Sequence, residues 1–335
     1  MLQVANATPL TTALMLAPDP AGVDTCWATI KGTFTLSPTP RLADVQRPVA
    51  IEPVHAGDPA TSSMLVPIEV GLAKPGTDVL LHGHAVAPDG RPVPRMDVAL
   101  EVGPVVQHAR VHGDRWWFRQ PGGWALSEPA PFERTPLLWE RTWGGRSDIG
   151  TGERHDPRNP IGCGYRHADA MDAPETLPAP NVEDANDPAT TPGTRGTPVG
   201  FLPIGAHWQP RPRYAGTYDD AWITRRAPYL PADFDARFLQ VAPPALIAST
   251  PLTGGEPIRA WGVTADGYVE SQVPSLTLSV TWRVAGRTES TDVAIDSVCL
   301  WPDDGVFTVC WRTALRCDKS ALKIRALHVD ARGLA

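Results

Sequence analysis

The stretch TCWATIKGTFTL at residues 25–36 decides the fold class, because apolar and polar side chains alternate along it with a period of two. One face carries mainly apolar residues, and the other carries threonines, Trp27 and Lys31, which is typical of a half-buried β-strand. SLTLSVTWRV at 275–284 repeats this pattern toward the other end of the chain. Further strands are predicted at TDVLLHGHAVA (77–87), RMDVALEVG (95–103), VVQHARVHG (105–113) and LKIRALHVD (322–330). These patterns predict a mainly β protein.

The composition supports short strands joined by turns. The 335 residues include 37 Pro and 29 Gly, which interrupt long helices. We therefore expect antiparallel sheets, arranged as a sandwich or a barrel-like structure, near both ends of the chain. The predicted organisation is an N-terminal β region (1–130), a central segment (131–245) and a C-terminal β region (246–335). These regions are expected to form one unit rather than independent domains.

The net charge and the cysteines indicate which partners and which cellular compartment to expect. The net charge is −7, with acidic and basic residues mixed along the chain, so no basic surface for nucleic acid is expected. No apolar run approaches the roughly 20 residues that span a bilayer, and no positive region precedes the mildly apolar N-terminal stretch. The five cysteines lack C-x-x-C spacing, which suits a reducing compartment. We expect a cytoplasmic protein that binds neither nucleic acid nor membrane.

The stretch SVCLWPDDGVFTVCWRTAL at 297–315 is predicted to be a hairpin. A two-residue turn at Asp304-Gly305 would place Cys299 opposite Cys310. The expected compartment and the wide spacing of a hydrogen-bonded pair both favour two free thiols over a disulfide.

The middle of the chain is less regular. Residues 166–200 are rich in Pro, Asp and Thr without periodicity, which predicts a long surface loop. After this loop, Thr217 and Asp220 resemble a capping box for a helix over 219–230. Residues 231–244 predict one more short turn or helix, which Pro243 and Pro244 end.

The central segment contains the most distinctive motif, PFERTPLLWERTWGG at 131–145 followed by ERHDPRNPIGCGY at 153–165. Its charged residues stand among tryptophans, where an unpaired charge would cost several kcal/mol. The arginines match the acidic groups closely in number, which favours a network of ion pairs over a catalytic acid–base pair. We predict that a structural brace is formed by Glu133, Arg134, Trp139, Glu140, Arg141, Trp143, Asp156, Arg158 and Asn159.

Known chemical motifs are absent. GLAKPGT at 71–77 lacks the Lys that follows the second Gly of a phosphate loop, and no nucleophile elbow or dinucleotide fingerprint occurs. His82 and His84 share a face of their predicted strand, but the sequence suggests no third ligand, so exposed histidines are favoured over a metal site. We expect no catalytic residue, no metal and no cofactor.

The tryptophans divide into two groups. Trp282 and Trp311 lie in predicted strands and should be core residues. A protein-binding surface is predicted to include the 166–200 loop together with Trp208, Tyr214, Trp222, Arg225 and Arg226, since Trp is enriched at binding hot spots. Burial of these tryptophans under the loop is the open alternative.

Several ordered motifs carry a family resemblance. They are KPGTDVLLHGHAVAPDGRPV (74–93), PFERTPLLWERTWGG (131–145), HDPRNPIGCGY (155–165), LPIGAHWQPRPRYAGTYDDAW (202–222), LPADFDARFLQVAPP (230–244) and GGEP (254–257). Over nearly its whole length the chain resembles the bacterial family catalogued as Domain of Unknown Function number 2169. The resemblance implies an adaptor or chaperone of the type VI secretion system. Such a protein holds a toxic effector, keeps it stable in the cytoplasm and helps load it onto the VgrG/PAAR spike, which is built from trimeric spike proteins and a PAAR-repeat cone.

The expected function is therefore non-enzymatic binding of an effector and of the secretion spike. Two alternatives stay open at this point. One is a hydrolase-type enzyme that uses Glu140, His155 and Asp156. The other is a structural component of the secretion apparatus.

Overall fold

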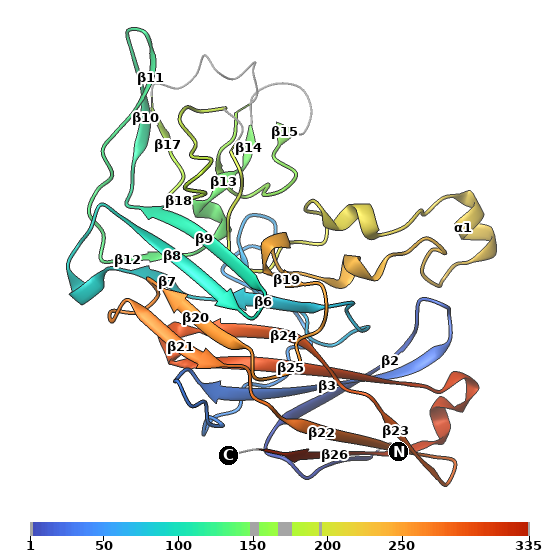
Figure 1. Ribbon diagram of the computed structural model, residues 1–335. Helices are drawn as coiled ribbons and strands as arrows, with labels where there is room; N and C mark the ends of the chain where they lie inside the picture. The colour runs from blue at the N-terminus through green and yellow to red at the C-terminus, as the bar shows by residue number, and fades with distance from the viewer. Residues whose placement is uncertain (1–2, 148–153, 167–175, 194–195, 334–335) are drawn as a thin grey trace.

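The computed structural model of the protein describes residues 3–147, 154–166, 176–193 and 196–333 (Figure 1). Strands make up 43% of the chain and helical segments 10%, which confirms the predicted mainly β class. The sheets are open rather than closed barrels. Glu153 of the central motif, and residues 167–175 and 194–195 of the predicted loop, lie outside the described residues.

The largest sheet has six strands drawn from both ends of the chain. In spatial order they are β19 (Ile247–Ala248), β6 (Thr77–Leu81), β24 (Ala294–Trp301), β25 (Val306–Arg316), β3 (Asp24–Thr35) and β2 (Thr11–Pro18). Neighbouring strands are antiparallel except β6 and β24, which run parallel. The hairpin β24–β25 thus separates β6 from β3, although these two strands precede it by more than 200 residues.

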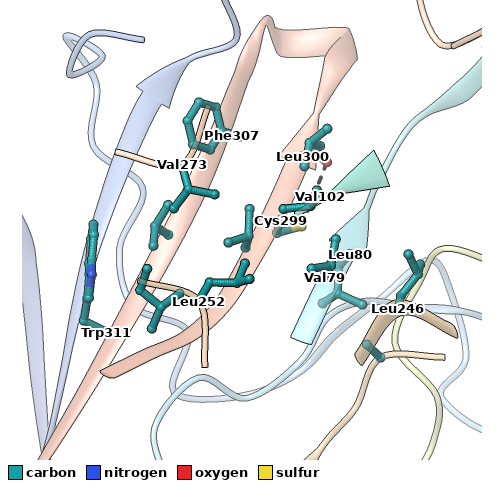
Figure 2. Close-up of a cluster of buried hydrophobic side chains, with 14 of the residues drawn as sticks. Val79, Leu80, Val102, Leu246, Leu252, Val273, Cys299, Leu300, Phe307 and Trp311 are labelled. Atoms are coloured by element: carbon teal, nitrogen blue, oxygen red, sulfur yellow. Dashed lines mark hydrogen bonds between the residues drawn. The ribbon is translucent and has the colours of Figure 1, made fainter. Parts of the chain in front are cut away.

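A second, five-stranded antiparallel sheet packs against the first. Its order is β18 (Val182–Glu183), β9 (Val105–His112), β8 (Arg95–Val102), β20 (Pro257–Trp261) and β21 (Tyr268–Gln272). Figure 2 shows the apolar side chains between them, with Val102 and Val273 facing Leu300 and Phe307 of the hairpin. Burying each such side chain contributes roughly 1.5–3 kcal/mol, so this interface is the main source of stability.

A third sheet extends the same core. It contains β1 (Gln3–Asn6), β26 (Ile324–Arg332), β22 (Thr277–Val284) and β23 (Arg287–Thr291), with β1 parallel to β26. Trp282 is fully buried and Trp311 is 3% exposed, which confirms both predicted core tryptophans.

Small sheets complete the fold around the central segment. β11 (Gly123–Leu126), β10 (Trp116–Gln120) and β17 (Thr176–Pro178) form a three-stranded sheet. The two-stranded pairs are β4 (Val54–His55) with β5 (Met64–Val66), β7 (His84–Val86) with β12 (Arg134–Pro136), β13 (Trp143–Gly144) with β16 (Cys163–Gly164), and β14 (Arg146–Ser147) with β15 (Arg154–His155). Residues 77–87, predicted as one strand, therefore divide at His82 and Gly83 between β6 and β7, which belong to different sheets.

The predicted register of the β24–β25 hairpin is wrong by two residues. Its loop has four residues: a 3₁₀ turn at Pro302–Asp304, followed by Gly305 in the left-handed region (φ 64°). Cys299 consequently lies opposite Thr308, and Cys310 lies opposite Ser297. The prediction that both thiols are free is confirmed.

The predicted helix is shorter than expected and has a different cap. α1 spans Asp220–Arg225, and the side chain of Asp219 accepts a hydrogen bond from the Trp222 backbone N–H (2.8 Å). Thr217 instead binds the Asp233 carboxylate through its backbone N–H and its hydroxyl. The predicted turn or helix in 231–244 corresponds to a 3₁₀ helix at Ala236–Leu239, and a second 3₁₀ helix follows at Pro244–Leu246. The remaining 3₁₀ helices described are Pro88–Gly90, Trp139–Arg141, Arg211–Tyr214 and Asp318–Lys323.

The prediction of a surface loop over 166–200 is wrong for residues 176–183, which contribute β17 and β18 to two sheets and bury Leu177 and Val182. Residues 184–188 form turns and coil and are mostly exposed, as predicted, whereas Val199 is buried. The strands are only two or three residues long, too short to leave a period-two pattern in the sequence.

Candidate functional site

The central motif folds around Ser63, a fully buried residue more than 70 positions earlier in the chain. The Ser63 hydroxyl donates to the Glu140 carboxylate and accepts a hydrogen bond from the Trp139 backbone N–H (2.8 Å). The Ser63 backbone N–H donates to the second Glu140 oxygen (2.8 Å). Trp139 is 3% exposed and its indole N–H donates to the carbonyl oxygens of Leu202 and Pro203.

Asn159 holds the next turn of the motif. Its fully buried side-chain amide lies 2.9 Å from the carbonyl oxygens of Trp139 and Trp143 and 2.7 Å from the Thr142 hydroxyl. Gly144 passes so close to Asn159 that a β-carbon there would lie 2.2 Å from the Asn159 carbonyl oxygen, at a φ of +141°. Only glycine fits both the contact and the backbone conformation.

Asp156 and Arg158 form the one ion pair that the described part of the motif makes within itself. Arg158 holds Asp156 through its backbone N–H (2.9 Å), its Nε (3.0 Å) and a terminal nitrogen (2.6 Å). The indole N–H of buried Trp143 lies 3.3 Å from the same carboxylate. Pairing with Asp156 raises the pKa of Arg158, against the opposing effect of partial burial.

Arg134 and Arg141 bind residues outside the motif. Arg134 reaches Asp303 in the β24–β25 loop (2.7 Å), and Asp303 also binds His84 (2.7 Å). Arg141 binds Asp114 (3.2 Å) and Asn181 (3.1 Å).

Glu133 is exposed, and its side chain has no partner among the residues that the structure describes. The contacts of the motif are those expected of a brace, except at Glu133, and they connect it to distant parts of the chain. That role stays a prediction.

The two carboxylates of the enzyme alternative are bound by other residues. Both oxygens of Glu140 bind Ser63, and both oxygens of Asp156 bind Arg158. His155 is half-buried in β15, opposite Arg146. In the described ranges, no group of three His, Cys, Asp or Glu residues is placed to hold a metal ion.

His82 and His84 both have partners rather than projecting freely into solvent. The His82 ring packs on Trp301, with ring centroids 4.6 Å apart, and His84 binds Asp303. Burial lowers the pKa of His82.

The predicted partner-binding residues lie in three different environments. Trp208 is 5% exposed and packs edge-on against Trp139, with ring centroids 5.7 Å apart, so the alternative of burial holds for this residue. Tyr214 is half-buried beneath the Arg237 guanidinium. Trp222 and Arg226 are also half-buried, whereas Arg225 is exposed.

Residues 216–230, which we call the arm, project from the body around α1 (Figure 1). Three large apolar side chains of the arm are exposed: Tyr218 at 53%, Ile223 at 59% and Tyr229 at 41%. The Trp222 indole donates to the Tyr229 carbonyl (2.8 Å) and closes the arm internally.

The arm is tied to the body at two points. Arg226 donates to the Pro20 carbonyl in the β2–β3 turn, and the Tyr229 ring lies against Gly22 of the same turn. The arm thus presents an apolar surface on a fixed support.

A groove lies at the base of the arm, between it and the central motif. It consists of two adjoining pockets, of about 420 Å³ and 340 Å³, which share Ile204, Pro210 and Pro244. The first pocket is also lined by Trp139, Arg158, Asp184, Gln209 and Arg213, among others. The second is also lined by Arg211, Tyr214, Arg237, Gln240 and Ser249, among others.

The sequence signals for these features are weak. The arm's exposed side chains stand in a helix too short to show which face is buried. The polar groups of the groove come from loops and 3₁₀ helices, where no periodicity marks the side that faces a cavity.

The chain matches the model of a bacterial family over residues 21–312, and that family is described as an uncharacterized protein conserved in bacteria, DUF2169. The chain belongs to this family. No curated protein and no solved structure matches it. In this DUF2169 protein, none of the described helices combines the length and apolar character needed to cross a bilayer.

Proposed function

We propose that this DUF2169 protein is a non-enzymatic, cytoplasmic adaptor that binds an effector of the type VI secretion system and helps load it onto the VgrG/PAAR spike. The observation that carries the proposal is the arm, which exposes Tyr218, Ile223 and Tyr229 on a segment fixed to the body. Exposed aromatic and apolar clusters of this kind are typical of protein-binding surfaces. A preformed surface also limits the entropy lost on binding. The family resemblance supplies the secretion system as the setting.

The proposal is tested by co-purification with candidate toxins encoded by genes that neighbour the gene of this protein. The Tyr218→Ala/Ile223→Ala double variant is expected to retain its fold, because both side chains are exposed, and to recover at least about tenfold less toxin, since hot-spot truncations cost about 2 kcal/mol or more. Tyr268→Ala on β21 is the matched control, because Tyr268 is 41% exposed and lies away from the arm. The proposal fails if the protein emerges alone while the candidate toxin stays soluble without it.

The rival hypotheses make different predictions for the same preparations. A hydrolase using Glu140 would show an enzymatic activity that Glu140→Gln abolishes, whereas for the adaptor the substitution would lower only the stability, because the Ser63 contacts are weakened. A structural component of the apparatus would sediment with assembled secretion machinery in the absence of any effector. An adaptor would require the effector for that association.

A further inference from the structure

Arg211 is a buried cation without a carboxylate in salt-bridge contact among the described residues, and the nearby Asp78, which raises the pKa of Arg211 against the larger effect of burial, is itself paired with Lys74 (2.8 Å). It is 9% exposed, and its guanidinium donates to the carbonyl oxygens of Phe238 (3.0 Å) and Ile204 (2.8 Å). Within the described ranges, Arg211 forms no salt bridge. Burial lowers the pKa of Arg211. A cation kept in this state next to a pocket has unused capacity for an anion.

Two side-chain amides in the groove are also incompletely bonded. Gln240 is 5% exposed, and its Nε2 has no hydrogen-bond partner although it lines the second pocket. In the first pocket, the buried Oε1 of Gln209 has no partner either. Each pocket is therefore lined by a side chain with one buried, unpaired polar atom, which is a donor in Gln240 and an acceptor in Gln209. An extended peptide backbone presents both kinds of group along its length.

The charge around the groove favours an acidic ligand. Arg158 and Arg237 are neutralised by Asp156 and Asp235. Arg213 lines the first pocket, is exposed, and has no side-chain partner among the residues described. Together with Arg211 it outweighs Asp184, the one carboxylate among the described residues that line the two pockets.

The walls of the groove are apolar. They include Pro210 and Pro244 where the pockets meet, with Trp139 on one side and Tyr214 on the other. Grooves lined by aromatic and apolar side chains accept extended segments with alternating side chains in successive pockets.

We propose that this groove binds an extended segment of a partner protein in which an Asp or Glu side chain is flanked by apolar residues. The carboxylate pairs with Arg211 and Arg213, and the peptide backbone bonds to Gln240 and Gln209. This inference rests on the proposed adaptor function only in that the protein has a protein partner, and it names the segment of that partner that the groove recognises.

The test is selection from a random peptide library displayed with blocked carboxyl ends, using the full-length protein as bait. The expected result is enrichment of sequences with an Asp or Glu between apolar residues. A synthetic peptide from that selection should bind at least about tenfold more weakly when its acidic residue becomes Asn or Gln, because a charge-assisted hydrogen bond contributes about 1.5–3 kcal/mol.

Matched variants locate the binding. Ser249→Trp places a large side chain at the exposed rim of the second pocket and should abolish binding, whereas Thr250→Trp, one residue outside the lining, should leave it unchanged. Arg213→Glu should weaken binding at least about tenfold, with Arg287→Glu at an exposed position of β23 as its charge-matched control. Gln240→Leu should weaken binding about three- to tenfold through the lost hydrogen bond.

Failure of this proposal is distinct from failure of the adaptor function. The groove is not a peptide site if selection enriches nothing, if enriched peptides lack an acid, or if Ser249→Trp binds them as the wild type does. Any of these results leaves toxin co-purification through the arm unaffected. If the toxin does not co-purify while peptides still bind in the groove, the adaptor proposal is contradicted instead.

Discussion

Ser63 joins two parts of the chain through one hydroxyl, which serves both the Glu140 carboxylate and the Trp139 backbone. Ser63→Ala removes that hydroxyl. The buried Trp139 backbone N–H and one Glu140 carboxylate oxygen then lose their hydrogen-bond partner. We expect the free energy of unfolding to fall by about 1–3 kcal/mol, measured by urea unfolding. Ser290→Ala on β23 is the control, because Ser290 is exposed, and it should change stability by less than about 0.5 kcal/mol. Equal effects of the two substitutions would show that the Ser63 contacts do not stabilise the motif.

Asp296 anchors a buried charge network and should give the protein a specific pH dependence. It binds Arg312 (2.8 Å) and Lys74 (3.1 Å), and all three side chains are almost fully buried. Burial alone would raise the pKa of Asp296, but the two cations outweigh it and hold the pKa below its ordinary value. The unfolded chain therefore takes up this proton first on acidification.

The contribution of Asp296 is complete above the unfolded pKa of about 4 and is lost as the pH falls through the lower folded pKa. Asp296→Asn should cost about 3–5 kcal/mol near neutral pH, because it removes the carboxylate that pairs with buried Arg312 and leaves Lys74 with Asp78 alone. The stability difference between the two proteins should then narrow as the pH falls below about 4, in guanidinium titrations at successive pH values. A stability difference that stays constant over this pH range would contradict the lowered pKa of Asp296.

The residues of the central motif could be selected from the sequence, but most of their partners could not. Tryptophans among matched charges indicate that the charges must be satisfied. The sequence favours pairing within the motif, and this holds for Asp156 with Arg158. Ser63, Asp114 and Asp303 come from distant loops, and no local pattern links them to Glu140, Arg141 and Arg134.

Among the elements, the β24–β25 hairpin makes a direct prediction about its two cysteines. Burial raises the pKa of Cys299 to about 12 and also raises that of Cys310, and the register places neither opposite the other. We expect both to resist iodoacetamide in the folded protein near pH 8, since the thiolate is the reactive form, and to react in guanidinium chloride. Peptide mass spectrometry measures both states. A disulfide between Cys299 and Cys310 under non-reducing conditions would overturn the four-residue loop.

Elements were predictable in proportion to their length. The long strands β3, β8, β9, β22 and β26 show enough alternation to be identified, and all are present near their predicted positions. The hairpin register was not predictable, because it depends on whether Pro302 begins a 3₁₀ turn that Gly305 ends in the left-handed region. The short strands β17 and β18 are held by neighbouring strands rather than by their own pattern.

For the whole molecule, the strand order predicts that the terminal regions depend on each other. Residues 1–245 alone would lack β24 and β25, which lie between β6 and β3. We expect neither the 1–245 fragment nor the 246–335 fragment to unfold cooperatively, because each exposes open strand edges and much of the core. Circular dichroism during thermal unfolding measures this. The full-length chain is the reference. A cooperative transition in the 1–245 fragment would contradict the expectation.

The fold class was predictable from composition and alternation, but the assembly of the sheets was not. The alternating patterns place strands near both ends of the chain and say nothing of which strands are neighbours. Pairing of β6 with β24, and of β3 with β25, depends on long-range packing of apolar faces rather than on any local signal.

The central position of the β24–β25 hairpin has a consequence for synthesis on the ribosome. Translation delivers β3 and β6 early, yet the pair that joins them is encoded between residues 294 and 316. The largest sheet can close only after Arg316, the last residue of β25, has left the exit tunnel. Until then the nascent chain carries exposed strand edges, so its yield in the cell should depend on holdase chaperones more than on the speed of elongation.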